Sequence, residues 1–264
     1  MSTKRLGILG AGAILPAFAA VLCAPLLPHN TEMAPRRHRP IRDRVEHGDG
    51  TVSSSNWSGF AVKGSGFTTA EGSWIVPAAK CNSGTQYASF WVGIDGYSSN
   101  TVEQTGTDSD CDGGSPRYYA WYEFYPKNPG NIAMSVKPGD HMSAKVVYSG
   151  SEFTVTIENV TTGASFSKSS TVPGAKRSSA EWIAEAPSSG SAVLPLADFG
   201  TVLLGKDHTS VADTCNAKDS STAGSIGSFS TIEKIIMEKH KVKEAIPAAL
   251  SSDGTSFSVT WAAK

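Results

Sequence analysis

The sequence has 264 residues, a formal net charge of −1 and 9% aromatic residues. Such a length suits one large domain, since all-β domains often reach about 200–250 residues. The near-neutral charge excludes a strongly basic nucleic-acid-binding protein, so we predict no nucleic-acid partner. The sequence contains neither a C-x-x-C nor an H-E-x-x-H pattern, and we predict no metal site and no cofactor.

Residues 1–24 are predicted to be a secretory signal peptide. Two basic residues precede an apolar core at residues 6–22, and residues 17–19 form an A-x-A-type cleavage site. A membrane anchor is the alternative, but Pro16 and several Gly and Ala residues weaken a run that barely reaches ~20 residues. We therefore expect a secreted protein with no membrane contact once the signal is removed.

Residues 25–53 are rich in Pro, Arg and polar residues, and such a segment cannot bury a core of its own. We expect it to be mobile, as a basic pro-segment or linker before a domain at residues 54–264. Residues 1–50 hold seven Lys/Arg and four Asp/Glu, which leaves 16 basic and 20 acidic residues on the rest. A basic leader on an acidic body can dock as an intramolecular inhibitor; a solvated linker is the alternative.

From Trp57 onward, short alternating segments separated by turn residues predict β-strands. They read NWSGFAV, GSWIVP, YASFWVGI, YYAWYEFY, HMSAKVVY, EFTVTIENV, FGTVLL and SFSVTW. Residues 148–151 and 162–163 have the composition of hairpin turns. Many short strands at close spacing favour an all-β domain, either an antiparallel sandwich or a barrel.

The most unusual stretch runs from Phe90 to Tyr125 and contains two aromatic strand-like runs. We predict a polar loop between them, because the intervening residues are rich in Gly, Ser and acids. The loop and its flanks carry Asp95, Glu103, Gln104, Asp108, Asp110, Asp112 and Glu123, with Trp91 and Trp121 beside them. Carboxylates, one amide and tryptophans indicate acid chemistry on an extended substrate.

Three cysteines follow the signal peptide, namely Cys81, Cys111 and Cys215. Two of them can pair in an exported protein. Cys81 with Cys111 is favoured, because both flank the central loop and a bond between them would order it. Spacing alone leaves the other pairings open.

Residues 231–246 fit two interpretations. Ile232, Ile235 and Ile236 recur near helical spacing, which favours an amphipathic helix ended by Pro247. A strand that runs on toward the C-terminal SFSVTW segment is the alternative.

Several kinds of catalytic site lack the residues that they need. Three of the six histidines lie in the leader and no G-x-S-x-G is present, which disfavours a serine or cysteine nucleophile. The Asp-Thr/Ser-Gly pattern of aspartic peptidases is also absent. Residues 108–113 imitate the start of a calcium loop, but Tyr119 stands where a bidentate glutamate is required.

What remains is a carboxylate assisted by an amide. Glu181 lies beside Trp182, where desolvation would raise its pKa, and a glutamate can act as general base on water. Gln104 can donate a hydrogen bond to a developing oxyanion. Taken alone, each residue is better explained as part of an exposed polar surface.

Six motifs containing these residues resemble, in the same order, the glutamic peptidases or eqolisins. The motifs are NWSGFAV (56–62), FWVGIDG (90–96), EQTGTD (103–108), AWYEFYP (120–126), AEWIAEAP (180–187) and ADFG (197–200). The resemblance implies a lectin-like, concanavalin A-like antiparallel β-sandwich with the active site on its concave face. It also favours a strand over a helix for residues 231–246.

The same resemblance implies a secreted, pepstatin-insensitive acid endopeptidase that is monomeric and acts on polypeptides. Gln104 and Glu181 match the catalytic pair, in which the glutamate activates water and the glutamine stabilises the tetrahedral intermediate. Five further residues match positions that line or support the cleft, namely Trp57, Trp91, Asp95, Asp108 and Glu123. Tyr119 departs from the family, which often has an acid at that position.

Two other functions stay open at this point. Glu123 and Glu181 could be the acid and nucleophile of a glycoside hydrolase, if their carboxyl groups lay about 5–9.5 Å apart. Trp91, Trp121 and Trp182 could instead form the stacking platform of a non-catalytic carbohydrate- or peptide-binding module.

Overall fold

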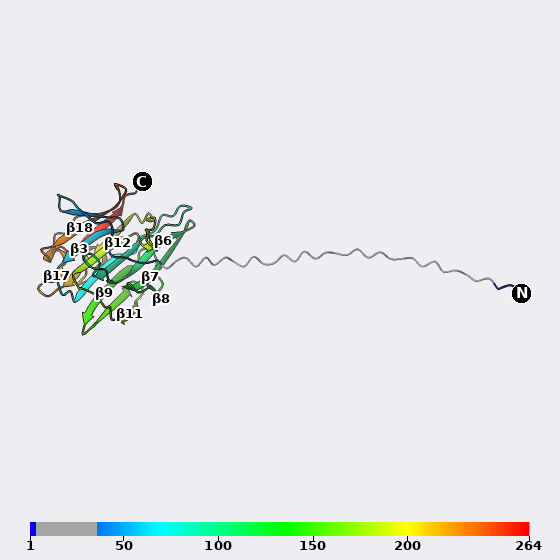
Figure 1. The fold of residues 1–264 in the computed structure, drawn as a ribbon, viewed down its shortest axis with the longest axis horizontal. Coiled ribbons are helices and arrows are strands. Elements are labelled where there is room, and N and C mark those ends of the chain that lie inside the picture. The colour runs from blue at the N-terminus through cyan, green and yellow to red at the C-terminus, as the bar shows by residue number, and fades with distance from the viewer. Residues whose placement is uncertain (4–35, 264) are drawn as a thin grey trace. The chain divides into compact units, whose positions relative to one another are not determined.

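A computed structural model describes residues 1–3 and 36–263 of the chain (Figure 1). All the strands below belong to one compact unit, which lies within residues 34–264. Apart from its first three residues, the predicted signal peptide lies outside the described residues. Within the described ranges, no helix is long and apolar enough to cross a membrane.

The regular secondary structure of the described residues is almost all strand, with one α-helical turn and one 3₁₀ turn. The strands are β1 (Val45–Glu46), β2 (Thr51–Ser54), β3 (Trp57–Lys63), β4 (Thr69–Ile75), β5 (Ser89–Ile94), β6 (Val102–Asp112), β7 (Ser115–Tyr125), β8 (Gly130–Ile132), β9 (His141–Ser149), β10 (Glu152–Asn159), β11 (Ala164–Ser170), β12 (Ser179–Glu185), β13 (Ser188–Ser189), β14 (Ala192–Val193), β15 (Thr201–Gly205), β16 (Asn216–Lys218), β17 (Ala223–Ser225), β18 (Ile232–Lys239), β19 (Val242–Pro247) and β20 (Ser256–Trp261). The helical turns are α1 (Lys206–Thr209) and η1 (Ile226–Ser228).

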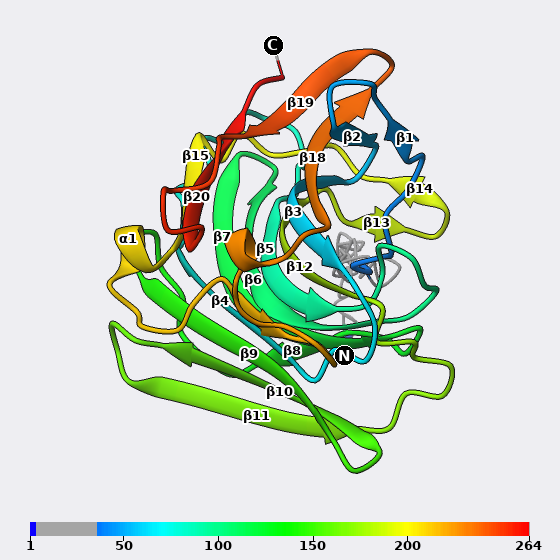
Figure 2. The same cartoon turned by 90° about the vertical axis from the view of Figure 1, so that its left-hand side faces the viewer.

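The strands form two layers. One layer follows the pairing order β8, β7, β6, β5, β12, β3 and β18. The other follows β20, β15, β4, β9, β10 and β11, and β19 joins the two by pairing with both β18 and β20. These pairings are antiparallel, whereas β2 runs parallel to β18. Figure 2 shows β5, β6 and β7 curving over β9, β10 and β11, and the predicted β-sandwich is confirmed.

Both faces of the first layer are buried. In β12, Ala180, Trp182 and Ala184 belong to the core between the layers, while Ile183 packs with Trp91 on the other face. Because strand side chains alternate between faces, Glu181 and Glu185 share the face of Ile183. Every residue of β12 is nevertheless buried, so that second face is covered too.

The cover of this face is the segment that was expected to be mobile. Residues 36–42 pack on the body, and Thr51–Ser54 form β2, so the predicted boundary at residue 53 falls inside a strand. Val52 is 1% exposed and joins Trp57 and Ile183 in an apolar cluster. Of the predicted segment at residues 25–53, residues 36–42 and 51–53 thus contact the sandwich, residues 43–50 are exposed, and residues 25–35 lie outside the described residues.

Two further predictions are settled by the strands. The polar loop predicted after Phe90–Ile94 is wrong, because Val102–Asp112 is a strand with ten consecutive buried residues. The polar side chains of this strand suggested a loop, but they are buried because the face of the sheet on which they lie is itself covered. Residues 231–246 are two strands joined at His240 and Lys241, whose positive φ angles end any helix, so the strand interpretation is confirmed.

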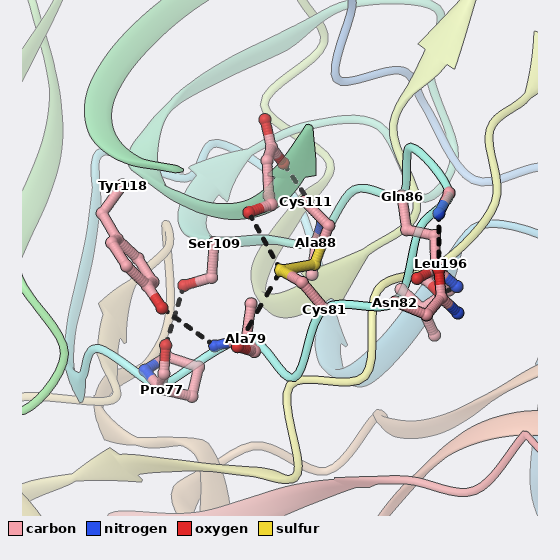
Figure 3. Close-up of a disulfide and its surroundings, with 12 residues drawn as sticks. Pro77, Ala79, Cys81, Asn82, Gln86, Ala88, Ser109, Cys111, Tyr118 and Leu196 are labelled. Carbon is pink, nitrogen blue, oxygen red and sulfur yellow. Dashed lines mark hydrogen bonds between the residues drawn. A yellow bond between two sulfur atoms is a disulfide. The ribbon is translucent and has the colours of Figure 1, made fainter. Parts of the chain in front are cut away.

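The predicted Cys81–Cys111 disulfide is present, and Cys215 is free and buried. Figure 3 shows how the bond ties the segment after Pro77 to the end of β6. Beside it, the backbones of Gln86 and Cys111 exchange two hydrogen bonds of 3.0 and 2.8 Å. The hairpin turns at 148–151 and 162–163 are confirmed by the pairing of β9 with β10 and of β10 with β11.

Removing this disulfide should destabilise the sandwich by about 3–4 kcal/mol, because it closes a loop of 30 residues in the unfolded chain. The measurement is urea unfolding of the double variant Cys81→Ala/Cys111→Ala. The matched control is Cys215→Ala, which removes a buried cysteine but no cross-link. Equal losses in the two proteins would show that the disulfide does not stabilise the fold.

Candidate active site

Residues 36–42, here called the leader segment, lie on the covered face of the first layer. Each backbone N–H and C=O group from Arg37 to Arg39 is hydrogen-bonded to the body. Arg37 and Ser188 exchange two bonds, each of 2.9 Å. Side chains of the sheet face therefore bind the backbone of this segment, as they would bind the backbone of a peptide.

The peptide group between His38 and Arg39 contacts Gln104, which is a predicted site residue, and Glu185, which is not. Gln104 donates from Nε2 to the carbonyl oxygen of His38 at 2.7 Å. On the other side, the N–H of Arg39 donates to Oε1 of Glu185 at 3.0 Å. The carbonyl oxygen of Arg39 in turn accepts a 3.0 Å bond from Trp57 Nε1.

Gln104 and Glu123 are brought together by strand register. They are direct partners across β6 and β7, so their side chains leave the same face. Gln104 Nε2 lies 3.5 Å from Glu123 Oε2, which also accepts the N–H of His38 at 2.8 Å. Burial raises the pKa of Glu123 well above its ordinary value, although the hydrogen bond from His38 opposes the shift.

Glu185, the last residue of β12, was not among the predicted site residues. Its Oε2 accepts a 2.8 Å bond from Trp91 Nε1 and lies 3.6 Å from Nδ1 of His38. Burial raises the pKa of Glu185 well above its ordinary value, and the charge of Glu123 adds to the rise, while the N–H donors oppose it. Glu185 therefore faces the same peptide group as Gln104.

Glu181, the predicted catalytic glutamate, lies elsewhere on the same face. It precedes Glu185 by four residues, or about 13 Å along an extended strand. In the ladder it shares a row with Gln104, with Gly93 between them. Burial raises its pKa, and the neighbouring carboxyl groups are Asp95 and Glu103 rather than residues around the leader segment.

Asp95 supports the site from behind. Its carboxylate accepts backbone N–H bonds of 2.8, 2.7 and 3.0 Å from Lys176, Arg177 and Ser178, and another 3.0 Å bond from the Ser178 hydroxyl. These bonds fix the turn that leads into β12. Asp95 therefore positions the strand that carries both glutamates.

Asp108 and Asp110 form a buried pair beside the peptide-binding face. The Tyr119 hydroxyl, at the position that departs from the family pattern, donates to both carboxylates at 2.6 and 2.9 Å. Burial and the charge of Asp108 together raise the pKa of Asp110 to about 8, while Arg36 opposes the shift. The Arg36 guanidinium pairs with Asp110 and lies 4.9 and 5.3 Å from the ring centres of Tyr87 and Tyr119.

Three tryptophans line this face. Trp57 and Trp91 meet edge to face at 5.0 Å, and Trp121 stacks on His38 at 3.5 Å with the rings 5° from parallel. Trp182 lies in the core between the layers instead. A stacking platform made of Trp91, Trp121 and Trp182 is therefore excluded.

Gly106 allows the tryptophans to pack so closely. It lies between Trp91 and Trp121 in the ladder. A Cβ atom at this position would lie 2.3 Å from the carbonyl oxygen of Phe90 and 2.6 Å from Cβ of Trp91. The glycine of the QTG motif therefore meets a steric requirement of the site.

The residues missed by sequence reasoning are Glu185 and Asn56. Asn56 Nδ2 lies 3.4 Å from Oε1 of Glu185, and its Oδ1 accepts the N–H of Arg42 at 2.9 Å. A signal for Glu185 was available, because AEWIAEA contains two glutamates at a spacing that places both on one face. In the part of the chain that the structure describes, no group of three or more His, Cys, Asp or Glu residues could hold a metal ion.

Comparison with known proteins decides the family. The model of the peptidase A4 family matches residues 55–245. The chain is 34% identical to aspergillopepsin-2 of Aspergillus niger over 192 residues, which are 63% of this chain and 68% of that protein. The chain is a member of the peptidase A4 family, the glutamic peptidases.

Solved structures of glutamic peptidases agree with the fold. Scytalido-glutamic peptidase with a peptide-based transition state analogue matches with a TM-score of 0.65 and 27% identity, over 78% of this chain and 98% of that one. SCP-B, an eqolisin in complex with the tripeptide Ala-Ile-His, matches with a TM-score of 0.63 and 26% identity, over the same shares. This glutamic peptidase is therefore a hydrolase of peptide bonds.

The stability of this glutamic peptidase should fall as the pH rises, and Glu103 should cause part of the fall. Burial raises the pKa of Glu103 from 4.5 to about 9, with a further contribution from the charge of Asp95. Between those two values the folded state holds a proton that the unfolded state has lost. Its stabilising contribution is thus complete below about pH 4.5 and is lost as the pH rises toward about 9.

Thermal unfolding from about pH 5 to about pH 9 tests this account. Glu103→Gln should flatten the decline and raise the Tm at the alkaline end, because the amide cannot ionise. Glu158→Gln, on an exposed position of β10, is the control and should keep the wild-type slope. An unchanged slope in Glu103→Gln would contradict the assignment.

Proposed function

We propose that this glutamic peptidase hydrolyses polypeptides at acidic pH with Glu185 as general base and Gln104 as oxyanion donor. The observation that carries the proposal is the peptide group of His38 and Arg39. Gln104 contacts its carbonyl oxygen at 2.7 Å and Glu185 accepts its N–H at 3.0 Å. Peptide-based ligands in the solved relatives support a polypeptide substrate.

The two residues suit the two halves of amide hydrolysis. An ionised Glu185 takes a proton from a water molecule, whose oxygen attacks the carbonyl carbon. Gln104 Nε2 donates to the oxygen as it gains negative charge. Glu185, which lies within hydrogen-bond reach of the amide nitrogen, then returns the proton to the leaving amine.

Acidic operation requires that Glu185 be ionised while the carboxyl groups beside it hold their protons. With the leader segment bound, burial raises the pKa values of Glu185 and Glu123, the charge of Glu123 adds to the rise at Glu185, and the charge of Asp108 contributes to both shifts. Interacting carboxyl groups of this kind lose their protons in separate steps. Glu185 accepts N–H bonds from Trp91 and Arg39, which favours its ionised form while its neighbours stay neutral.

The other predicted residues support this pair. Glu123 and Trp57 bind the peptide backbone on either side, and Trp91 orients Glu185. Asp108, with Tyr119, belongs to the acidic pocket that holds Arg36. Glu181 is assigned a supporting position beside Asp95 rather than the catalytic position proposed from the sequence.

The leader segment is assigned the role of an intramolecular inhibitor. It occupies the backbone hydrogen bonds that an extended substrate would need, and it brings Arg36 to a buried aspartate pair. Secretion by means of residues 1–24, and a monomeric enzyme, remain part of the same proposal. The glycoside hydrolase alternative is not favoured by any contact in this site.

Substituting the two glutamates of β12 separately tests the assignment of the base. Glu185→Gln should lower the rate by about 10²–10⁴-fold, because a positioned acid–base group is lost, whereas Glu181→Gln should retain most activity. The measurement is cleavage of a denatured protein at acidic pH by leader-free enzyme, with pepstatin present. Loss of activity in Glu181→Gln together with full activity in Glu185→Gln would restore the sequence-based assignment.

Gln104→Ala should also lower kcat, by about 10²–10³-fold, with little change in KM, because an oxyanion donor acts in the transition state. The measurement is steady-state kinetics on a short peptide at acidic pH. Gln86→Ala, a glutamine outside this face, serves as the control. A change confined to KM would show that Gln104 binds substrate without stabilising the oxyanion.

A further inference from the structure

We infer that this chain cuts its own leader at the peptide bond between His38 and Arg39. The inference rests on the proposed function, since it assigns Glu185 and Gln104 to hydrolysis. The two ends of this one peptide group contact the two proposed catalytic side chains. The bond thus lies where a substrate bond would have to lie.

Neighbouring bonds are not placed in this way. The carbonyl oxygen of Arg37 accepts from the backbone N–H of Ser188, and that of Arg39 accepts from Trp57 Nε1. The bond after Arg39 leads into Pro40, whose nitrogen has no hydrogen to give to Glu185. Within the leader segment, only the bond from residue 38 to residue 39 has both contacts.

Anchors on the N-terminal side hold this register. Arg36 enters the pocket of Tyr87, Tyr119 and Asp110, and the His38 ring stacks on Trp121. A slip of one residue would turn alternate side chains to the opposite face and remove both contacts.

Contacts on the C-terminal side of the bond also hold this register. Asn56 accepts the N–H of Arg42 at 2.9 Å, and the N–H of Ile41 donates to the carbonyl of Gly96 at 3.1 Å. Further along, β2 pairs with β18 and ties the leader to the sandwich. The scissile group is therefore fixed between two independently held ends.

The step balances with one molecule of water. The water oxygen bonds to the carbonyl carbon of His38, and the carbon–nitrogen bond to Arg39 breaks. One water proton passes through Glu185 to the nitrogen of Arg39, and no oxidant or reductant is needed. The products are a chain ending in the His38 carboxyl group and a chain beginning with the Arg39 amine.

Cleavage would weaken the cover of the active site. A new carboxyl group at His38 would lie beside Glu123 and Glu185, and burying a further carboxyl group in this cluster is costly. The fragment ending at His38 would keep the contacts of Arg36 and Arg37, whereas residues after 39 stay attached through β2. One continuous segment would thus become two ends, each held by only part of the contacts.

The test uses the full chain, purified near neutral pH and then acidified. Intact mass and N-terminal sequencing should identify a first product that begins Arg39-Pro40-Ile41 and a complementary fragment that ends at His38. The rate should not change over a dilution series, because the reaction is intramolecular. Cleavage of a denatured protein is measured on the same samples.

Three variants sharpen the result. Arg39→Pro removes the N–H that Glu185 accepts, and the fragment ending at His38 should no longer form. Gly48→Pro places proline in an exposed turn closed by the bond from Gly50 to His47, and it should mature as the wild type does. Gln104→Ala should slow the cut by about 10²–10³-fold.

The outcomes separate this inference from the proposed function. Activity on the denatured protein, with the first cut at another bond or with the leader intact, would overturn the inference and leave the proposed function standing. A cut that speeds up in proportion to concentration would also overturn it. Neither self-cleavage nor activity at any pH would contradict both.

Discussion

The structure depends on the burial of carboxyl groups on one face of a β-sandwich. Glu123, Glu181 and Glu185 are each fully buried on the outer face of the first layer. Charged groups are costly to remove from water, so such groups stay neutral or accept hydrogen bonds from fixed donors. Here the donors come from the tryptophans and from the backbone of the leader segment, which explains why a basic polar segment is well packed.

The same burial links structure to activity. A face with several neutral carboxyl groups and one that accepts N–H bonds can act as a base in acid, where an ordinary protein surface would bear many charges. The leader segment adds the backbone N–H groups of His38 and Arg39 to this arrangement. Inhibition and recognition of substrate would therefore use the same hydrogen bonds, and a tightly bound leader is also a well-placed substrate.

The rigid ladder explains how distant residues meet. Gln104 and Glu123 face the same side because β6 and β7 pair in one register, while Glu185 arrives from β12 across β5. Asp95 fixes the turn before β12, and Gly106 lets Trp91 lie against β6. Such positioning from the backbone of a packed sheet holds side chains more precisely than a mobile loop can.

The sequence by itself determined the all-β class, the hairpins and the family, and it favoured the Cys81–Cys111 bond without excluding the other pairings. It did so because these depend on local alternation, turn residues and ordered motifs. The sequence also named Gln104 and most of the residues around it. It could not choose between Glu181 and Glu185, because both have the spacing of one strand face and both lie in one motif.

Only the tertiary structure shows which of the two glutamates contacts the leader segment, and where that segment lies. Glu185 and Gln104 contact the same peptide group, and Arg39 of that group lies 146 residues from Glu185 in the sequence. The polar residues of Val102–Asp112 indicated a loop because composition does not reveal that a polar face is covered. Pairing of β2 with β18 likewise joins residues far apart in sequence, and no local pattern encodes such a contact.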